Sequence, residues 1–339
     1  MAYRPAALMG LGSYLPPWVI SNEDLAAELD TTDEWITTRT GIRARHRVSP
    51  GTSTGDLAVE AGHRALKSAG LDAEPGAVDA VVLATTTPDH PCPATAPDVA
   101  ARLGLGPIGA YDISAVCSGF LYALATASAQ ITAGQAERIL VIGAETYSTI
   151  INPADRTTSV IFGDGAGAVV LAAAADPAQP GVLLGVDLGS DGLHRDLISI
   201  PAGGSRQRST PGEPDPDDRY FTMQGKKVFA AAVARMAESS TSVLDSIGWT
   251  TDQVDHLVGH QANARILKAL ARQLGIPDER AVVHLDRVGN TSAASIPLAL
   301  AHAAAEGTLT PGSRVLLTAF GGGLTWGSVA LTWPDVTPA

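Results

Sequence analysis

Short apolar runs alternate with longer stretches of helical spacing along this chain. Residues 80–84 and 138–143 are short, apolar and rich in β-branched side chains, as buried strands are. Between them, residues 119–132 are rich in alanine and have helical periodicity. Near-continuous apolar strands are typical of parallel sheets that helices cover on both faces. The pattern therefore predicts an α/β fold.

The same strand-and-turn unit recurs in the second part of the chain. Residues 78–82 resemble residues 254–258, and residues 138–141 resemble residues 314–317. Both pairs are separated by the same offset, because 254 − 78 and 314 − 138 both equal 176. Chance similarity between short apolar runs is the alternative explanation. Two equal offsets favour an internal repeat in which both halves share one fold.

The boundary between the halves is expected in residues 176–181, where turn-forming residues follow an apolar run. We therefore expect an N-terminal half over residues 1–175 and a C-terminal half over residues 176–339. Inside the second half, residues 202–218 hold Gly, Pro, Ser, Arg and Asp without periodicity. This segment is expected to be an exposed loop.

Composition narrows the class of protein and its partners. Apolar residues make up 45% of the chain and charged residues 17%, which suits a compact enzyme. The net charge of −12 disfavours nonspecific binding to nucleic acid or to an anionic membrane. No apolar run is long enough to span a membrane, and two cysteines allow neither a disulfide framework nor a four-cysteine zinc site. We expect a cytoplasmic protein without metal, nucleic-acid or membrane partners.

Cys117 is the first candidate for chemistry. It follows a strand-like segment and directly precedes the alanine-rich helix of residues 119–132. The free backbone amides and the dipole at a helix N-terminus favour a thiolate over a thiol, so a nucleophile would be well placed here. A small buried hydrophobic residue is the more common role of a free cysteine, and this segment alone favours that role.

His260 and Asn290 are the second and third candidates. His260 follows an apolar strand, and the carboxyl ends of strands are where α/β sheets bind their ligands. Asn290 lies in a turn of small residues before a helix. Taken alone, a structural histidine and a helix cap are the commoner roles. Shifted by the repeat offset, however, Cys117 corresponds to residue 293 (117 + 176) in this same turn, so the repeat brings the two turns to one site.

Two glycine-rich segments have different interpretations. Gly321, Gly322 and Gly323 follow an apolar strand, and such a run lets backbone approach a ligand and present amide donors, although a flexible hairpin turn is an equal alternative. The segment 162–167 lacks the glycine spacing of a dinucleotide-binding motif. A nicotinamide site is not expected.

Together these segments resemble the thiolase-fold condensing enzymes, and specifically the beta-ketoacyl-acyl-carrier-protein synthase III family. The motifs that carry the resemblance run in order along nearly the whole chain: Asp33-Glu34-Trp35-Ile36, Arg39-Thr40-Gly41-Ile42, the turn at Cys117, Phe162-Gly163-Asp164-Gly165-Ala166-Gly167, His260-Gln261-Ala262-Asn263 with Arg265, Gly289-Asn290-Thr291-Ser292, and the glycine run with Trp326-Gly327-Ser328. The resemblance implies a thiolase-like fold of two α/β halves in a five-layered αβαβα core. Related elongating enzymes have a second histidine where this chain has Asn290, which points to the branch that uses acyl-CoA starters.

The resemblance also implies a mechanism without metal or redox cofactor. Cys117 attacks an acyl-CoA thioester, and the amides of Cys117 and Gly322 form the oxyanion hole. Malonyl-acyl-carrier protein then enters, and neutral His260 and Asn290 stabilise the enolate formed as carbon dioxide leaves. The product starts a fatty-acid or polyketide chain.

Further roles follow from the resemblance alone. Trp35, Arg39 and Arg156 would lie along the CoA nucleotide, Asn263 would touch the pantetheine arm, and Phe320 would shield the site. Arg265, with Lys268 and Arg272 on the same helix face, would meet the acidic carrier protein. Each has a plain alternative as a solvated charge or a core aromatic.

Cys92 lies in a proline-rich loop over residues 85–95. In the family the enzyme is a homodimer, and this loop crosses to the partner subunit and closes the acyl channel. Members restricted to acetyl starters have Phe at this position. The smaller Cys92 would therefore leave a deeper acyl pocket, although an inert structural thiol is the alternative.

A second function is an acyltransferase on the same fold, which moves the acyl group from Cys117 to an alcohol or amine without decarboxylation. The His260 and Asn290 pair favours condensation, because simple transfer needs no enolate stabiliser. Thiolase-like or hydrolytic activity, or an inactive partner subunit, are further alternatives, and the intact Cys117 argues against inactivity.

Overall fold

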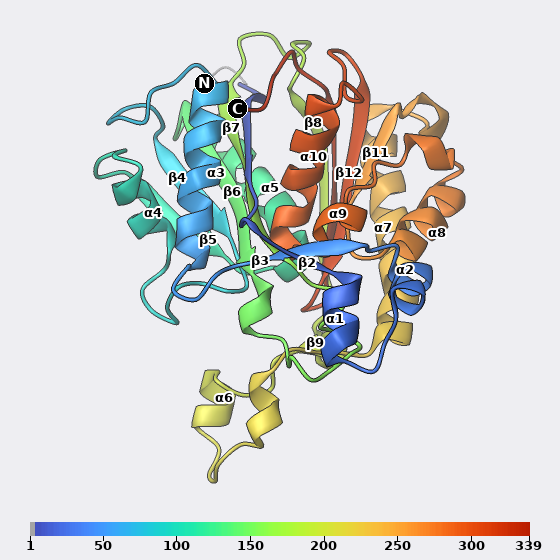
Figure 1. Ribbon diagram of the computed structural model, residues 1–339. Helices are drawn as coiled ribbons and strands as arrows, with labels where there is room; N and C mark the ends of the chain where they lie inside the picture. The colour runs from blue at the N-terminus through green and yellow to red at the C-terminus, as the bar shows by residue number, and fades with distance from the viewer. Residues whose placement is uncertain (1–3) are drawn as a thin grey trace.

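Two sheets lie on either side of a central helical layer in the computed structural model, which describes residues 4–339 (Figure 1). The first sheet has the strand order β1-β7-β6-β4-β5, with bounds β1 Ala6–Tyr14, β7 Asp164–Ala173, β6 Arg138–Thr146, β4 Ala80–Ala84 and β5 Gly109–Ile113. The second has the order β11-β12-β13-β8, with bounds β11 His256–Gly259, β12 Arg314–Gly321, β13 Thr325–Thr332 and β8 Leu183–Ser190. Strand β4 runs parallel to β5 and β6, and β11 runs parallel to β12, whereas the other pairs are antiparallel.

Helices form three layers around these sheets. The central layer consists of α5 (Gly119–Thr132) and α10 (Ser295–Ala305), which contact strands of both sheets. The outer helices are α3 (Thr54–Ser68) and α4 (Ala96–Arg102) on the first sheet, and α7 (Gly225–Ile247) and α8 (Ala264–Leu274) on the second. This is the five-layered αβαβα arrangement, so the predicted fold class is confirmed.

Smaller elements connect the layers. Two short sheets pair β2 (Trp18–Ser21) with β3 (Ala44–Arg47) and β9 (Ile198–Ser199) with β10 (Thr222–Met223). The remaining short helices are α1 (Asn22–Glu28), α2 (Asp33–Thr40), α6 (Ser205–Arg208), α9 (Leu285–Val288) and the 3-10 turns η1 (Val116–Ser118), η2 (Tyr147–Thr149), η3 (Gly192–Leu197), η4 (Pro216–Arg219), η5 (Thr251–Gln253), η6 (Asp278–Arg280) and η7 (Ser292–Ala294). The predicted loop over residues 202–218 is mostly exposed, contains α6 and projects from the body of the molecule (Figure 1).

The equivalent elements of the two halves that pack around the central helices are separated by the same number of residues in the sequence. Strand β4, turn η1, helix α5 and strand β6 begin 176 residues before β11, η7, α10 and β12 respectively. The proposed division between residues 175 and 176 falls between the end of β7 and the start of β8, and it stays a prediction.

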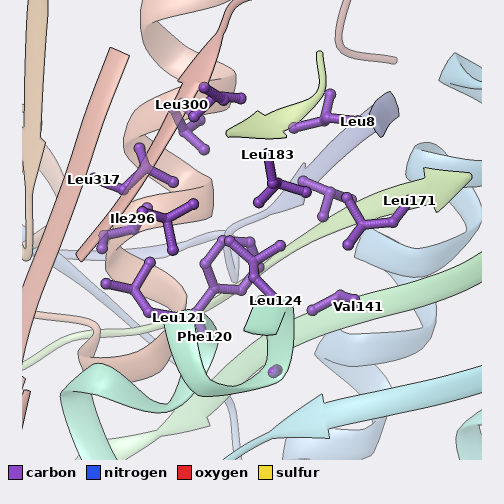
Figure 2. Close-up of a cluster of buried hydrophobic side chains, with 14 of the residues drawn as sticks. Leu8, Phe120, Leu121, Leu124, Val141, Leu171, Leu183, Ile296, Leu300 and Leu317 are labelled. Atoms are coloured by element: carbon purple, nitrogen blue, oxygen red, sulfur yellow. The ribbon is translucent and has the colours of Figure 1, made fainter. Parts of the chain in front are cut away.

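One hydrophobic core joins the halves. Figure 2 shows Leu121 and Leu124 of α5 among Ile296 of α10, Val141 of the first sheet and Leu317 of the second. All five are at most 2% exposed. Burying side chains of this size from both halves contributes about 1.5–3 kcal/mol each, so the central helices hold the two sheets in a fixed relation.

Among residues 4–339, no helix is both long and apolar enough to cross a membrane.

Candidate active site

Two equivalent backbone turns meet between the halves. Val116 and Ser292 both have positive φ angles, of 49° and 48°, and they begin the contacting turns η1 and η7. Such a conformation costs on the order of 1–3 kcal/mol for a residue other than glycine, and it persists where the surroundings fix it. The strain is present at equivalent positions, because 116 + 176 = 292. The following residues, Cys117 and Ala293, are the middle residues of the two turns.

Glycines permit the close approach of other backbone to these turns. A Cβ on Gly143 of β6 would lie 2.5 Å from the carbonyl oxygen of Ala293. A Cβ on Gly321, at the end of β12, would lie 2.8 Å from the amide nitrogen of Cys117. Both contacts are with backbone, which cannot move aside cheaply. The glycine run forms the hairpin turn between β12 and β13, which was the alternative interpretation, and it brings backbone of the second half directly beside Cys117.

A cavity of about 690 Å³ brings together Cys117, His260 and Asn290. Its wall is mainly apolar and includes Phe162, Phe221, Met223, Phe229, Met236, Ile266 and Phe320. Cavities of this size and composition are typical of sites for small molecules. The three residues come from turns that are far apart in the sequence.

His260 is buried, with 4% of its surface exposed, and it follows the last residue of β11. Its Nδ1 lies 2.7 Å from the Ser295 hydroxyl at the start of α10. Burial lowers the pKa of His260 to about 3, so the imidazole is neutral near pH 7. When Nδ1 accepts the hydrogen bond from Ser295, the proton is on Nε2, which is then a donor toward the cavity.

Asn290 is also buried, and the oxygen of its side-chain amide is already hydrogen-bonded within the protein. Its Oδ1 accepts a hydrogen bond from the Ser292 backbone amide at 2.9 Å, and its own backbone amide donates to Ile161 at 2.9 Å. The side-chain NH₂ therefore remains to donate into the cavity that Asn290 lines. The site has two fixed neutral donors, one from His260 and one from Asn290.

Cys117 lies two residues before α5 begins at Gly119, close to the helix N-terminus as predicted. Its environment nevertheless favours the thiol. Burial raises the pKa of Cys117 to about 12, a hydrogen bond with Ser292 lowers it, and the nearby Glu145 carboxylate raises it. The helix N-terminus stabilises a thiolate, but its effect is smaller than the free-energy cost of removing the thiolate from water, so the thiol is favoured.

The residues expected along the CoA nucleotide are gathered around one ring. The guanidinium carbon of Arg39 lies 4.5 Å from the Trp35 ring centroid, and that of Arg156 lies 5.2 Å from it. Asn263 links this group to the cavity, because its Nδ2 donates to the Arg39 carbonyl at 3.0 Å and the residue lines the cavity. The Asn263 side chain also caps α8 through the Arg265 amide at 2.8 Å. Its predicted contact with the pantetheine arm stays a prediction.

Arg265, Lys268 and Arg272 are exposed on one side of α8. Arg265 also lines the mouth of the cavity. Cys92 is exposed in its loop and lies outside the set of residues that line the cavity of this single chain. The docking face and the acyl pocket stay predictions.

Three residues near Cys117 were not predicted from the sequence. Ser295 orients His260, and Glu145 and Tyr147 are both fully buried at the end of β6. The Tyr147 ring stacks on Phe162 with centroids 4.6 Å apart, and its hydroxyl has no hydrogen-bond partner among the described residues. A glutamate that ends an apolar strand was the available signal for Glu145.

Among residues 4–339, no group of three or more His, Cys, Asp or Glu side chains is arranged to hold a metal ion.

Comparison with known proteins identifies the family. Models of 3-oxoacyl-[acyl-carrier-protein (ACP)] synthase III and of its C terminal match residues 111–192 and 244–333. The chain is 65% identical over 330 residues to beta-ketoacyl-[acyl-carrier-protein] synthase III 5 of Streptomyces coelicolor, covering 97% of this chain and 98% of that protein. It is 54% identical to beta-ketoacyl-[acyl-carrier-protein] synthase III of Pseudomonas aeruginosa, covering 99% and 98%.

Solved structures agree with this assignment. The crystal structure of 3-oxoacyl-(acyl carrier protein) synthase III from Pseudomonas aeruginosa matches with a TM-score of 0.91 and 52% identity, covering 99% of this chain and 100% of that one. A priming beta-ketosynthase from a polyketide biosynthetic pathway matches with a TM-score of 0.90 and 34% identity, covering 98% and 97%. The resemblance seen in the sequence is confirmed: the chain belongs to the beta-ketoacyl-acyl-carrier-protein synthase III family of thiolase-fold condensing enzymes.

Proposed function

We propose that this chain carries out the family's reaction in two half-reactions, with Cys117 as the nucleophile of the first and His260 and Asn290 as the hydrogen-bond donors of the second. The family consists of acyltransferase-type condensing enzymes that join an acyl-CoA starter to malonyl-acyl-carrier protein and so initiate fatty-acid or polyketide chains. The observation that best supports this assignment of two half-reactions is that one nucleophile and two neutral hydrogen-bond donors line a single cavity. Primary fatty-acid and specialised polyketide pathways both fit it.

In the first half-reaction, Cys117 attacks the acyl-CoA thioester and releases CoA. The negative charge on the tetrahedral oxygen is held by the backbone amides of Cys117 and Gly322. The approach of Gly321 to the Cys117 amide supports this role, because it brings the β12 end and the nucleophile within van der Waals contact. The product is an acyl group on Cys117.

In the second half-reaction, the malonyl thioester carbonyl receives hydrogen bonds from His260 Nε2 and Asn290 Nδ2. Loss of carbon dioxide turns this carbonyl into an enolate, so these donors stabilise the transition state more than the substrate. The low pKa of His260 supports the assignment, because a neutral imidazole with Nδ1 engaged is a donor rather than a proton source. The enolate carbon then attacks the acyl-Cys117 carbonyl.

The substrates would reach this cavity along two basic surfaces. Arg39 and Arg156 beside Trp35 would contact the CoA nucleotide, with Asn263 on the pantetheine arm and Phe320 shielding the site. Arg265, Lys268 and Arg272 would bind the acidic carrier protein. Their exposure on one helix face supports this, since the chain as a whole carries a charge of −12 and repels another acidic protein elsewhere.

We further propose a homodimer in the cytoplasm that needs no cofactor, since the thioester and the leaving carbon dioxide supply the driving force. The short edge strand β5 is available for pairing between two copies. In such a dimer Cys92 would close the acyl channel of the partner subunit. Both cysteines are free thiols, which fits a reducing compartment.

Release of carbon dioxide tests condensation against simple acyl transfer to an alcohol or amine. The enzyme is mixed with acyl-CoA and malonyl-acyl-carrier protein, and carbon dioxide is measured together with the intact mass of the protein. Condensation predicts one carbon dioxide for each ketoacyl product, and an acyl adduct on Cys117 that Cys117→Ala lacks. Acylation without carbon dioxide release, with acyl transfer to an added amine or alcohol, would favour the alternative.

A further inference from the structure

The proposed first half-reaction requires a proton acceptor for Cys117. The resting residue is a thiol, and its proton must leave before the sulfur can attack a thioester. His260 is a weak acceptor, because burial lowers its pKa to about 3 and its Nδ1 is already bonded to Ser295. The acceptor is therefore expected among the other groups around the nucleophile.

Glu145 is a buried carboxyl group at this point. It lies at the end of β6, beneath the two turns, and is 0% exposed. It accepts hydrogen bonds from the Thr86 amide at 3.0 Å, the Thr87 hydroxyl at 3.0 Å and the Ser292 hydroxyl at 3.0 Å. Within the described part of the chain, no basic side chain forms an ion pair with it. Burying a carboxylate that has only neutral hydrogen-bond partners lowers the stability of the folded protein, which suggests that Glu145 has a function.

Ser292 connects this carboxyl group to the nucleophile. Its hydroxyl donates to Glu145 at 3.0 Å, and it begins turn η7, which contacts the turn η1 that holds Cys117; its side chain lowers the pKa of Cys117. The positive φ of 48° and the bond from the Ser292 amide to Asn290 Oδ1 fix the residue between the two turns. A hydroxyl can accept one proton and donate another, so it can pass a proton without becoming charged.

We propose that Glu145, acting through the Ser292 hydroxyl, is a positioning residue that holds the Cys117 proton between the two half-reactions. This inference rests on the role proposed above for Cys117. It assigns a task to a carboxyl group that neither half-reaction otherwise uses.

The transfer balances in both directions. In priming, the Cys117 S–H proton passes to the Ser292 oxygen as the Ser292 proton passes to the Glu145 carboxylate; the thiolate forms the new C–S bond, and CoA leaves as a thiolate that takes a proton from water. In condensation, the enolate carbon bonds to the acyl carbon and the Cys117 C–S bond breaks. The released thiolate then recovers its proton from the Glu145 carboxylic acid through Ser292. The pair therefore never carries two negative charges.

The electrostatics of the cluster suit this exchange. Burial raises the pKa of Glu145 to about 7, although the bonds from Thr86, Thr87 and Ser292 lower it, so the group can gain and lose a proton near neutral pH. A permanently charged Glu145 would oppose the thiolate, as its effect on the Cys117 pKa shows.

Few other titratable groups face the carboxyl group. The phenol of Tyr147 is buried beside it with a pKa well above its usual value, because of burial and of the charges on Cys117 and Glu145. On the neighbouring strand β7, Asp164 lies opposite Thr146 and is bonded to Ser148 and Val48. From α3, Thr54 bonds to Thr146, and Asp56 of that helix forms an ion pair with Arg102.

The pH dependence of Cys117 alkylation tests the proposal. The rate of modification by iodoacetamide is measured by intact mass from pH 5.5 to 9.5 in the full-length protein. In the wild type, the rate should show a step near pH 7 in addition to the steady rise that direct ionisation of the thiol causes, because each Glu145 that loses its proton can accept the one from Cys117. Glu145→Gln should lose this step and react at least tenfold more slowly at pH 8, in line with the roughly 10²–10⁴-fold effect of general acid–base groups.

Two further variants distinguish a proton relay through Ser292 from a purely structural role of Glu145. Ser292→Ala keeps the carboxyl group and should also lose the step. Asp164→Asn is the matched control, since it neutralises another fully buried carboxyl group on the adjacent strand, and it should keep the wild-type profile. Far-UV circular dichroism checks that each variant is folded.

A Glu145→Gln variant that keeps the step, or that reacts faster than the wild type at pH 8, would overturn the proposal. Such a result would mean that the carboxylate merely repels the thiolate. An unchanged profile in Ser292→Ala would do the same. Failure of acyl-CoA to label Cys117 in the wild type would instead overturn the proposed nucleophile itself, and with it this inference.

Discussion

Replacing Glu145 with Gln should stabilise the folded protein at pH 8 while leaving its stability at pH 5 nearly unchanged. The carboxyl group is fully buried, and its pKa is about 7 in the folded protein against an ordinary value of 4.5. A group whose pKa is raised by folding contributes stability that is fully present below pH 4.5 and is lost as the pH rises through 7. Glutamine does not titrate and resembles the protonated acid.

The magnitude follows from the two pKa values. At about 1.36 kcal/mol per pH unit, the interval from 4.5 to 7 corresponds to a loss of about 3.4 kcal/mol in the wild type above pH 8, of which about 2.5 kcal/mol falls between pH 5 and pH 8. The amide replaces an acceptor oxygen with a donor, and one hydrogen bond lost here costs about 1 kcal/mol at every pH. The variant should therefore match the wild type at pH 5 and exceed it by about 2 kcal/mol at pH 8.

Urea unfolding of both proteins, followed by tryptophan fluorescence at several pH values, measures this difference. His260 and His284, whose pKa values burial lowers to about 3, destabilise the fold as the pH falls below about 6.5, but they do so in both proteins and cancel. Equal differences at pH 5 and pH 8 would refute the reasoning, because they would show that Glu145 does not titrate in this range. A variant less stable than the wild type at pH 8 would refute it as well.

The other predictions concern the proposed roles of single residues. Asn290→Ala should leave acylation of Cys117 intact and lower the rate of condensation by at least about tenfold, measured as the two half-reactions separately; equal losses in both would contradict the division. Arg265→Glu should raise the KM for malonyl-acyl-carrier protein at low salt without changing acyl-CoA priming. Cys92→Phe should lower activity with long or bulky acyl-CoA while sparing acetyl-CoA, because each buried methylene contributes about 0.8 kcal/mol; an equal loss for all chain lengths would contradict the channel assignment. Gly321→Ala should destabilise the fold by about 1–3 kcal/mol and slow acylation, because its Cβ would meet the Cys117 amide nitrogen at 2.8 Å.

The sequence predicted the fold class from local signals, whereas it predicted the three central residues through the repeat and the family resemblance, since each residue taken alone favoured a structural role. The apolar strands, the 176-residue offset and the turn at Cys117 are all features of continuous segments. The structure brings Cys117, His260 and Asn290 to one cavity, and the repeat had indicated this for Cys117 and Asn290. Their roles in the reaction stay predictions.

The supporting residues could not be found in the same way. The bond between His260 and Ser295 joins residues 35 positions apart, and that between Glu145 and Ser292 joins residues 147 apart. Such pairs depend on three-dimensional contact rather than on spacing. The protonation state of Cys117 could not be predicted from the sequence either. Its position before a helix indicated a thiolate, but burial raises the pKa of the thiol more than the helix lowers it, and burial is seen only in the folded structure.

The continuous core between the halves limits how this protein can move. Enzymes with separate domains often admit substrates by opening a hinge between them, but here α5 and α10 are shared packing partners of both sheets. At their N-terminal ends, a Cβ on Gly119 would be just 3.7 Å from that of Ala293, so there is no seam along which the halves can separate. Substrate exchange is therefore expected to depend on the side chains and loops that line the cavity holding Cys117, His260 and Asn290, rather than on opening between the halves.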